Sequence, residues 1–474
     1  MQPLRSIDPV IVFRNSQGDI ARGTLTHLQR RSLDMEIYTP NSIVQISEVL
    51  SELTIRIGTK TLYKGKAAVV SLVNTGLMSV ASVTLHDEWQ ELETLGLDKE
   101  SVAKEARTFV EEWRQRIEVR RDYQLVVTEM RAYFAEVSRW IGQADIASGL
   151  PRDNTGRVRE DVFYELATPL LDKGREYLRW FEDEAALVDV EHASVHRSFA
   201  QAAIHPLILR APFVYRTFTK PLGYAGDYEM VNQILGDPRQ GPTTYFQLVN
   251  FMFLQAGVAQ AHRNRVDILC ERLEALARKA VQEQRTMRVL NIGCGPAAEV
   301  QRFAQRNPGF DKLEFVLVDF SSETLEYTRQ KLLDAQAGPD KPLRFTLQHE
   351  SVNQLLKRAQ RSSATDADEP FDFIYCAGLF DYLTDKVCNR LIQYFVSRSR
   401  AGGRVMVTNV HKDNPERHWM EHFLEWYLIY RNEADMQRVA PASLTQVETY
   451  RDQTGVNVFL EGTVTPETVF KAGT

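Results

Sequence analysis

The sequence feature that most constrains the fold is an apolar run, Val289–Ile292, that ends in Gly293 and Gly295. Glycines lack a side chain, so the backbone can turn sharply at them and come close to a ligand. Pro296 follows and is predicted to open a helix, because proline suits the first helical position, where its missing N–H costs nothing. The free N–H groups of that first turn would then face the ligand. A strand, a glycine turn and a helix in this order predict an open α/β sheet.

A second apolar run, Leu313–Val318, delivers Asp319 at its end, about twenty residues after the glycines. A carboxylate at the tip of that strand can accept hydrogen bonds from both hydroxyls of a ribose. Ligands of open α/β sheets bind outside the carboxyl ends of the strands, so both features belong to one edge of the sheet. The sequence therefore predicts a nucleoside-cofactor site on a doubly wound α/β sheet.

Three further features bear on which cofactor binds, since the glycine spacing also fits the dinucleotide fingerprint. The helix start carries Glu299 and offers no cradle for a pyrophosphate. The fourth strand ends in the small residues Cys376–Gly378, which leave room for a methionine moiety. Two strand-like runs, 445–451 and 456–464, close the chain and predict an antiparallel edge pair that completes a seven-stranded sheet. These features favour S-adenosylmethionine over a nicotinamide.

Composition and charge exclude several classes of protein. Hydrophobic residues make up 43% and charged residues 25% of the 474 residues, as in globular proteins, and this length suits about two to four domains. A net charge of −6 argues against a nucleic-acid partner. The start, Met1–Arg5, lacks the apolar core of a signal peptide, and no run reaches membrane-spanning length, so we expect a cytoplasmic protein without a membrane span. The cysteines lack metal-ligand spacing, which predicts free thiols and no metal: Cys270, Cys294, Cys376 and Cys388.

The patterning divides the chain into three predicted domains. Residues 1–92 hold short β-prone runs separated by turn chemistry, which predicts a small all-β barrel. Residues 93–285 change to helical periodicity and are predicted to form an α-helical region. Residues 286–474 alternate strands with helices and would form a Rossmann-like seven-stranded α/β domain. The expected fold class is a multi-domain chain made of these three parts.

The order of the β-prone runs, with the ending Gly65–Leu85, resembles a PilZ domain. That resemblance implies a family that binds cyclic di-GMP through an arginine-rich lead and an Asp-x-Ser-x-x-Gly signature. The alternation in Leu33–Ile37 sets the register, and the signature positions then fall on residues that depart from it: His27, Gln29 and Ser32. Arg30 and Arg31 would either meet phosphates or form a solvated face. We expect a degenerate PilZ-like module that docks a protein partner or regulates, and no cyclic di-GMP.

Two stretches of the helical region suggest more than packing. The loop Phe218–Glu229 joins glycines, a proline, tyrosines and an acid, and such a loop suggests a lid that faces the ligand. Asp227 would alternatively cap the helix that follows. In a predicted helix over 245–276, Arg263 or Arg265 would pair with the carboxylate of the cofactor or lie on the surface.

The region after the predicted fifth strand, 404–407, is the expected acceptor side. Asn409 is placed at the tip of that strand, and His411 follows it. Among the histidines, His411 is favoured as a base over His349, His418 and His422 because of this position. A predicted helix then presents aromatic residues on one face, as a core stripe or as an apolar substrate pocket: Trp419, Phe423, Trp426, Tyr427 and Tyr430.

Together these segments resemble a family of bacterial class I S-adenosylmethionine-dependent methyltransferases. That family is assigned to the biosynthesis of a 3-hydroxypalmitic acid methyl ester, an extracellular signal. The matching segments occur in family order over roughly half of the chain. They are Lys220–Tyr228, Leu290–Pro296, Phe371–Tyr382, Asn409–Pro415 and Trp426–Arg431.

The resemblance also implies roles for residues at the strand ends. The tip of the third strand, 343–348, would touch the adenine, with Ser351 bonding the exocyclic amine and Val352 packing the ring. The residues predicted to bind the cofactor are Tyr224, Asp227, Arg263, Asn291, Gly293, Cys294, Gly295, Asp319, Phe320, Ser351, Val352, Cys376, Ala377 and Gly378.

The expected activity is methyl transfer to a small acceptor, the carboxylate of a fatty or β-hydroxy acid that acts in signalling. Displacement at a sulfonium methyl needs in-line alignment more than acid–base help, and a carboxylate arrives deprotonated. Asn409 and His411 would orient the acceptor, and Tyr382 or Tyr224 would cover it. Two alternatives stay open: a protein methyltransferase whose β-domain recruits the target, and a non-catalytic scaffold that senses the methyl donor and signals through the PilZ-like domain.

Overall fold

The structure is a computed structural model of the 474-residue chain. It describes residues 10–15, 20–29, 31–37, 48–57, 60–74, 79–87, 119–147, 149–307, 309–335, 342–361 and 369–465, and the isolated residues 44, 89, 103, 106, 107, 110 and 111. Arg30 and the segment Met1–Arg5 lie outside the described residues. The chain divides into two compact units, one of residues 1–129, 183–203 and 220–224, the other of residues 130–182, 204–219 and 225–474.

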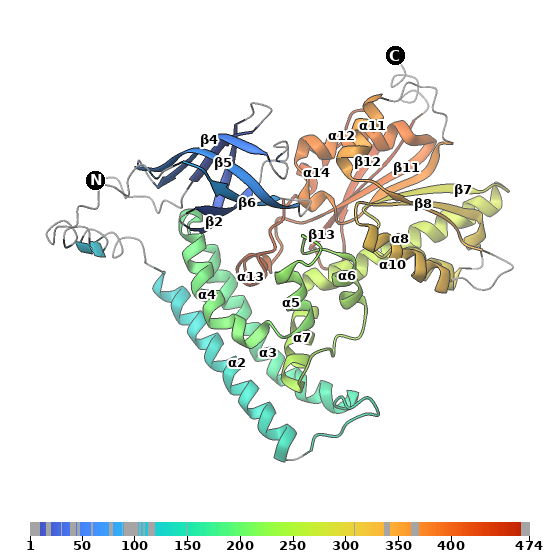
Figure 1. Cartoon of the computed structure of the whole chain (residues 1–474). Coiled ribbons are helices and arrows are strands. Elements are labelled where there is room, and N and C mark those ends of the chain that lie inside the picture. The colour runs from blue at the N-terminus through green and yellow to red at the C-terminus, as the bar shows by residue number, and fades with distance from the viewer. Residues whose placement is uncertain are drawn as a thin grey trace. The chain divides into compact units, whose positions relative to one another are not determined.

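The first unit contains a closed six-stranded barrel, which confirms the predicted all-β fold of the N-terminal part (Figure 1). Its strands follow the order β1-β2-β3-β6-β5-β4, and β1 pairs with β4 to close it. They are β1 Val10–Arg14, β2 Ile20–Leu28, β3 Ser32–Ile37, β4 Val49–Ile57, β5 Lys60–Asn74 and β6 Ser79–Leu85. The side chains of Leu33, Met35 and Ile37 are buried inside the barrel, as their alternation predicts.

The three PilZ signature positions hydrogen-bond to one another between β2 and β3. The Nε2 atoms of Gln29 and His27 lie 3.2 Å apart, and Ser32 Oγ donates to Gln29 Oε1 at 3.2 Å. His27 and Gln29 are exposed and Ser32 is half-buried. These polar groups therefore bond to close neighbours in the sequence, and a regulatory role for the barrel stays a hypothesis.

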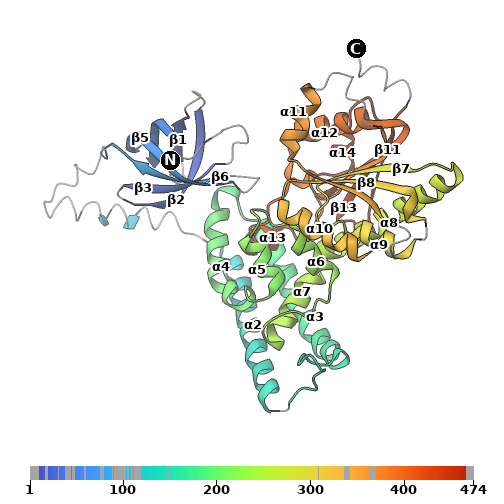
Figure 2. The same cartoon turned by 45° about the vertical axis from the view of Figure 1, so that its right-hand side comes forward.

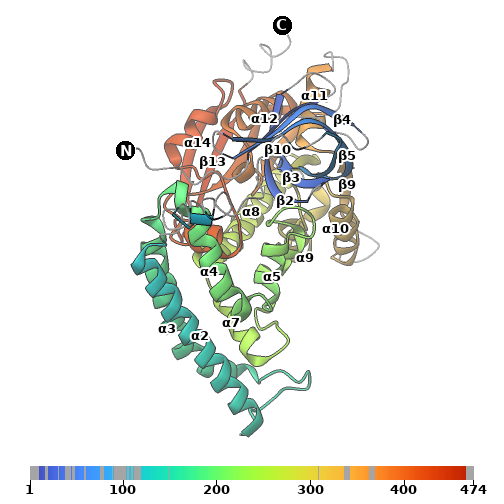
Figure 3. The ribbon, with the colours of Figure 1, turned by 60° about the vertical axis from the view of Figure 1, so that its left-hand side comes forward.

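Helices fill the middle of the chain, as the periodicity predicts. They are α2 Arg121–Ala147, α3 Glu160–Ala186, η2 Val190–His192, α4 Ala193–Ile208, α5 Pro212–Thr219, α6 Tyr228–Leu235, α7 Thr244–Leu254 and α8 Gly257–Gln282. Helices α2 and α3 lie side by side (Figure 3). Tyr133 of α2 donates from its hydroxyl to Leu170 O at 2.7 Å, and its ring lies 5.3 Å from that of Tyr177. This pair of helices packs through aromatic side chains.

The prediction of one helix over 245–276 is wrong, because the chain breaks between α7 and α8. The first N–H groups of α8, on Gly257 and Val258, donate to the carboxylate of Glu416 at 2.6 and 2.9 Å. An acid at a helix N-terminus satisfies N–H groups that lack partners inside the helix and complements the helix dipole. The break therefore depends on a residue 159 positions away, which a local pattern does not reveal.

The second unit contains a seven-stranded sheet of order β12-β13-β11-β10-β7-β8-β9 (Figure 1). Its strands are β7 Met287–Ile292, β8 Leu313–Asp319, β9 Arg344–His349, β10 Phe371–Cys376, β11 Ser399–Val410, β12 Thr445–Arg451 and β13 Asn457–Thr463. Strands β7 to β11 pair in parallel, whereas β13 pairs antiparallel with both β11 and β12. The predicted Rossmann-like sheet with an antiparallel pair at one edge is confirmed.

Helices cover both faces of this sheet (Figure 2). One face carries α8 with α9 Ala298–Arg306 and α10 Ser322–Asp334, and the other carries α11 Val352–Arg361, α12 Asp385–Arg398 and α14 Glu433–Val439. Successive strand residues point to opposite faces. Val289 accordingly packs in the same core as α8, and Leu290 packs in the core that contains α12. The polar ends of the strands remain as the place for a ligand.

Two elements beyond the fourth strand differ from the prediction. Strand β11 extends to Val410 because it pairs with β13, so Asn409 lies inside the strand opposite Val458 and not at a tip. Helix α13, Arg417–Phe423, ends before Trp426, since Glu425 adopts a left-handed conformation with φ of 50°. Trp426, Tyr427 and Tyr430 therefore lie outside any helix, and the single aromatic helix predicted there is wrong.

The buried aromatic residues of α13 pack in the core of the second unit. The ring of Trp419 lies 5.1 Å from that of Phe253 on α7, and the ring of Phe423 lies 4.6 Å from that of Phe181 on α3. Glu182, beside Phe181, accepts hydrogen bonds from the N–H groups of His418 and Trp419 at 2.9 and 2.7 Å. For these two aromatics the structure shows the packing alternative.

Candidate active site

The glycine turn after β7 has the strained geometry that only small residues tolerate well. Gly293 and Gly295 have φ of 71° and 51°. The N–H groups of Gly293 and Cys294 donate to Val318 O at 2.9 and 3.1 Å, which fastens the turn to β8. The prediction for Pro296 is wrong, because α9 begins at Ala298 after a left-handed Ala297 and the proline precedes the helix.

Asp319 ends β8 with a carboxylate directed at the glycine turn. Its Oδ2 accepts from Gly295 N at 3.1 Å and its Oδ1 accepts from Ser321 N at 2.9 Å. The residue is 4% exposed, and this burial raises the pKa of its carboxyl above the ordinary value. Each carboxylate oxygen retains a lone pair beyond the bond that it accepts, so the group can still accept from ribose hydroxyls.

Buried polar residues form hydrogen bonds with one another next to the glycine turn. Glu299 Oε1 accepts from Asn291 Nδ2 at 3.1 Å and from the hydroxyl of Tyr375 at 2.7 Å. Burial raises the pKa of the Glu299 carboxyl, while the Tyr375 hydrogen bond acts in the opposite direction. Asn291 Oδ1 is buried without a hydrogen-bond partner among the described residues. Asn291 is thus held in place by Glu299 and keeps one free acceptor near the turn.

One side-chain and one backbone hydrogen bond join the ends of β8 and β9. His349 Nε2 donates to Phe320 O at 2.7 Å, and Glu350 N donates to Asp319 O at 3.1 Å. Ser351 lies at the start of α11, where its Oγ accepts from Gln354 N at 3.3 Å, and the half-buried Val352 is the first residue of that helix. The exposed ring of Phe320 lies at the same sheet edge. The residues predicted to meet the adenine are therefore gathered beside Asp319.

The turn after β10 lies against the side chain of Arg265. Cys376 is buried, and Gly378 has φ of 93° and donates to Thr408 Oγ1 at 3.1 Å. A Cβ at Gly378 would lie 3.0 Å from Nη1 and 3.1 Å from Nη2 of Arg265. The guanidinium of Arg265 thus lies directly against this turn, next to the half-buried Ala377.

Arg265 is 7% exposed, and its Nη1 has no hydrogen-bond partner among the described residues. Burial lowers the pKa of this guanidinium, and the charges of Asp381 and Glu299 act in the opposite direction. More than nine in ten buried polar groups of native proteins have a partner, so the unpartnered Nη1 leaves this guanidinium able to bind an anion. The methionine carboxylate of a nucleoside cofactor is such an anion.

Arg263, the arginine predicted to bind the cofactor, is placed differently. Its Nε donates to Ile234 O at 2.9 Å and its Nη2 donates to Leu254 O at 2.8 Å. These bonds join α8 to the ends of α6 and α7 and occupy the guanidinium. Of the two arginines considered from the sequence, Arg265 is the one at the sheet edge.

The sequence of residues 290–405, which covers the glycine turn, Asp319 and the end of β10, matches the family described as "Methyltransferase domain". This part of the chain is a methyltransferase domain. Such a domain implies S-adenosylmethionine as the methyl donor, and the residues present fit it through the acceptors of Asp319 and the unpartnered Nη1 of Arg265. Among the described residues, no cluster of histidine, cysteine, aspartate or glutamate could hold a metal ion, and no helix is long and apolar enough to cross a membrane.

Solved structures with similar folds include a possible exported protein from Bordetella parapertussis, 15% identical, with a TM-score of 0.40 over 53% of this chain and 86% of that one. Magnesium protoporphyrin IX methyltransferase from Synechocystis, with bound SAH, is 12% identical, with a TM-score of 0.35 over 53% and 98%. The N-methyltransferase NodS from Bradyrhizobium japonicum, in complex with S-adenosyl-L-homocysteine, is 15% identical, with a TM-score of 0.32 over 50% and 97%. No curated protein matches the chain. At these TM-scores the similarities say nothing about the acceptor.

Beyond the end of β10, the methyltransferase domain contains an aromatic pair. Tyr382, half-buried at the end of η4 Phe380–Tyr382, accepts at its hydroxyl a hydrogen bond of 2.9 Å from Trp426 Nε1. A Cβ on Gly226 would lie 2.8 Å from the Tyr382 hydroxyl oxygen, so the loop before α6 approaches this tyrosine closely. The structure thereby brings Tyr382 and the predicted lid loop together.

Asp227 in that loop serves as a helix cap. Its Oδ1 accepts from Met230 N at 2.9 Å, and its carboxylate binds Arg216, with Nη2 and Oδ2 2.8 Å apart. Tyr228 then donates to Glu323 Oε1 on α10 at 2.9 Å. Asp227 is fully buried in this arrangement, which is the capping alternative weighed from the sequence. Tyr224, in the preceding turn, belongs to the other compact unit and is half-buried.

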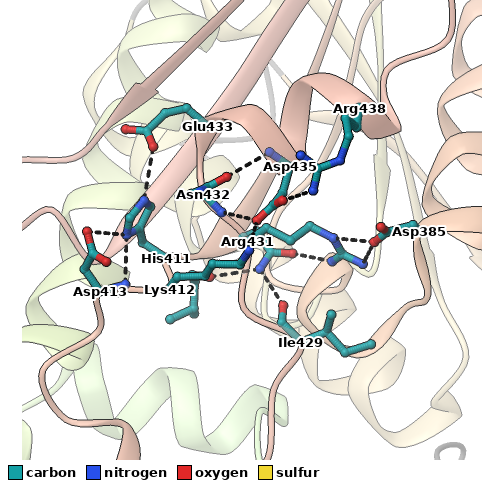
Figure 4. Close-up of polar contacts among 12 residues, drawn as sticks. Asp385, His411, Lys412, Asp413, Ile429, Arg431, Asn432, Glu433, Asp435 and Arg438 are labelled. Atoms are coloured by element: carbon teal, nitrogen blue, oxygen red, sulfur yellow. Dashed lines mark hydrogen bonds and ion pairs between the residues drawn. The ribbon is translucent and has the colours of Figure 1, made fainter.

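Asn409 is hydrogen-bonded to the buried Arg431, whereas His411 belongs to a separate set of contacts with Asp413 and Glu433 (Figure 4). Arg431 donates from Nη1 to Asn409 Oδ1 at 2.7 Å and to Phe380 O at 2.8 Å, and it pairs with Asp385 at 2.7 Å. Asn409 Nδ2 donates to Ile429 O at 2.8 Å. Both polar atoms of the Asn409 side chain are thus engaged inside the protein.

His411 has partners at both ring nitrogens. Its Nδ1 accepts from Asp413 N at 3.0 Å, so the neutral ring carries its proton on Nε2, which donates to Glu433 Oε2 at 3.1 Å. The residue is almost fully buried. A methyl acceptor would have to displace Asp413 or Glu433 to reach this imidazole. These contacts favour a structural role for His411 over a role as a base.

One buried histidine of the domain was not considered from the sequence. His262 lies on α8 one turn before Arg265, and its Nδ1 donates to Val258 O at 2.8 Å. Its ring lies 6.5 Å from that of Trp426. The spacing of three residues between His262 and Arg265, which puts both on one helix face, is the signal that could have found it.

Proposed function

We propose that this methyltransferase domain methylates the carboxylate of a fatty or β-hydroxy acid that acts in signalling. The observation that supports a carboxylate is the state of the polar groups at the end of β11, where Asn409 and His411 are engaged with Arg431 and Glu433. Among the described residues at this end of β11, neither of these two side chains is free to deprotonate an acceptor. A carboxylate is already ionised at neutral pH and needs none.

We propose that the donor is held at five points of the sheet edge. Asp319 would accept the ribose hydroxyls, the glycine turn would approach the methionine part, and Ser351 with Val352 would meet the adenine. Arg265 would bind the methionine carboxylate by a charge-assisted hydrogen bond. When bound, S-adenosylmethionine supplies a methyl group that a carboxylate oxygen takes while the C–S electron pair returns to sulfur, so that no proton moves.

The resemblance of residues 220–431 to the 3-hydroxypalmitic acid methyl ester family supports an acyl acceptor. We also propose that the barrel is a degenerate PilZ-like module that docks a protein partner and binds no cyclic di-GMP, since His27, Gln29 and Ser32 depart from the nucleotide-binding signature and bond to one another. A chain with this role would work in the cytoplasm. These proposals go beyond the domain assignment and need their own tests.

The test of the activity is transfer of tritium from labelled donor to defined acids by the purified chain. We expect label in the methyl ester of a long-chain acid, released as volatile methanol on mild alkaline treatment. Label in a protein band would instead identify a protein methyltransferase. Donor binding by calorimetry without turnover on any fraction, together with a co-purifying partner, would contradict the proposal and favour the sensing scaffold.

A further inference from the structure

We propose that one side of the barrel, formed by β1, β2, β4 and β5, docks a different protein through carboxylates on the surface of that protein. We call this side the basic face. The inference rests on the proposed docking role of the barrel and adds the surface and the charge of the partner. The four strands belong to the first compact unit.

Charged residues are divided unevenly among the strands of the barrel. The four strands of the basic face contain one acidic residue, Glu52, whereas their basic residues are Arg14, Arg22, Arg56, Lys60, Lys64 and Lys66. Strand β3 has the opposite composition, with Asp34 and Glu36 and no lysine or arginine. The whole chain has a net charge of −6, so the basic face differs in sign from the molecule that carries it. A surface of this kind attracts an anionic partner.

The pairing of the strands brings three of these cations to one side of the sheet. Arg22 lies opposite Val12, and Val12 lies opposite Thr54. Thr54 in turn lies opposite Lys64, so Arg22 and Lys64 stand in one row across four strands. Neighbouring strands are about 4.8 Å apart, which makes this row about 14 Å long. Arg56 is two residues beyond Thr54 and therefore points to the same side of β4.

The three cations are open to a partner. Arg22, Arg56 and Lys64 are exposed, and none of them has an ion-pair partner among the described residues. Arg14 differs, because its Nε lies 3.1 Å from Glu52 Oε2. The one acidic residue of the four strands is thus already paired, and the charge of the other cations remains available.

Apolar side chains are exposed beside these arginines. An antiparallel strand with one side in water normally carries polar residues on that side. Val10 lies opposite Arg56 and is 41% exposed, and Ile20, two residues before Arg22, is 64% exposed. Because side chains alternate along a strand, both point outward together with the arginines. Apolar residues at the centre of a patch with enriched arginine are the composition of a protein–protein interface.

The chemistry of the basic face favours a protein over other anionic partners. Arginine binds a carboxylate through two parallel hydrogen bonds. Nucleic acid would meet repulsion from a chain with a net charge of −6. Binding to a lipid surface relies on tryptophan, phenylalanine and leucine side chains, whereas the apolar residues beside these arginines are the shorter Val10 and Ile20. The occupant that fits is therefore a protein surface rich in aspartate and glutamate.

The experiment measures the binding of fluorescein-labelled poly-L-glutamate to the full chain by fluorescence anisotropy. We expect binding that weakens as salt is added, because exposed charges are screened. The double variant Arg22→Glu/Arg56→Glu should raise the Kd by about tenfold or more, since two attractive charges become repulsive. The double variant Arg31→Glu/Arg278→Glu changes the net charge equally at exposed positions outside the four strands and should bind nearly as the unmodified chain does. Thermal unfolding reports whether each variant is folded.

Two further probes test the class of the partner. Single-stranded DNA, and vesicles of phosphatidylglycerol and phosphatidylcholine in equal parts, should bind more weakly than poly-L-glutamate. Tighter binding of either probe that is lost in Arg22→Glu/Arg56→Glu overturns the assignment to a protein. Self-association in sedimentation experiments that the same substitutions abolish overturns it too, because the occupant would then be a second copy of this chain.

The outcomes separate this inference from the proposals on which it rests. No binding of poly-L-glutamate at low salt, or equal binding by the unmodified chain and Arg22→Glu/Arg56→Glu, overturns the basic face. A protein that co-purifies equally with these two chains overturns the basic face as well but leaves the docking role of the barrel intact. A chain that binds poly-L-glutamate at this face and transfers no methyl group supports the inference while contradicting the proposed activity.

Discussion

Two buried polar clusters of the second unit differ in one respect. Around Arg431, after β11, the guanidinium donates to Asn409, Phe380, Leu383 and Asp385. On α8, Nη1 of Arg265 is buried without a hydrogen-bond partner among the described residues. A buried polar atom without a partner costs about 1–3 kcal/mol. The engaged cluster therefore stabilises the fold, and the open cluster is retained at a cost that ligand binding would offset.

The largest effect is expected for Arg431→Met, which removes the centre of the engaged cluster. Three backbone or amide oxygens would lose their donor, and the free energy of unfolding should fall by about 3–5 kcal/mol. Denaturant unfolding measures it. Arg451→Met, which removes an exposed arginine paired with Glu433 at 2.6 Å, is the control and should change stability far less. Equal effects of both variants would contradict the contrast between the clusters.

Asp319→Ala should weaken donor binding about 100-fold. It removes two charge-assisted hydrogen bonds to the ribose and also the acceptor that holds Gly295 N. Isothermal calorimetry with S-adenosylmethionine measures the dissociation constant. Asp334→Asn, at the exposed end of α10, should leave it unchanged. An unaltered affinity in Asp319→Ala would show that the donor does not lie across this sheet edge.

Arg265→Met should weaken donor binding by about 10- to 30-fold while leaving stability the same or higher. The loss is that of one charge-assisted hydrogen bond, and the gain comes from removing an unpartnered buried cation. Calorimetry and thermal unfolding on the same sample test both parts. We expect the opposite for Arg263→Met, which breaks hydrogen bonds to Ile234 O and Leu254 O. This variant should lower the free energy of unfolding more than it weakens the binding of S-adenosylmethionine.

The affinity for S-adenosylmethionine should fall as the pH is lowered. The pH at which it falls should be higher than the pKa of an ordinary aspartate. The ionised carboxylate of Asp319 is the form that accepts from the ribose, and burial raises the pKa of this group above 3.8. Binding is therefore intact above the raised pKa and is lost as the pH falls through it. Calorimetry across the acidic range measures this. A midpoint at or below 3.8 would contradict the burial of the free carboxylate.

The smallest effect is expected for Glu433→Gln, at the edge of the engaged cluster. The amide oxygen still accepts from His411 Nε2, and the partly exposed pair with Arg451 is screened, so stability should change by less than about 1 kcal/mol. Methyl transfer should be nearly unchanged. A tenfold or greater fall in kcat would show that His411 and Glu433 act together as a base. The engaged side chains after β11 would then serve catalysis and not only the stability of the fold.

The sequence was sufficient for the sheet and for the ends of β7, β8 and β10, but not for the end of β11. Buried parallel strands appear as continuous apolar runs, and Gly293 directly follows β7, Asp319 ends β8 and Gly378 lies two residues beyond β10. The direction of a helical side chain was not predictable. Arg263 and Arg265 are two residues apart, about 200° around the helix, and only tertiary packing decides which faces the site. The break before Gly257 and the network of Arg431 depend on partners distant in the sequence.

The bond between Glu416 and the first N–H groups of α8 joins two segments with separate duties. Residues 257–265 include Arg265, and the segment after β11 carries Glu416 and Trp426. Because Glu416 accepts from the first two N–H groups of α8, this helix cannot shift along its axis unless those bonds break or the segment after β11 moves with it. The position of Arg265 against the β10 turn therefore depends on a carboxylate beyond β11.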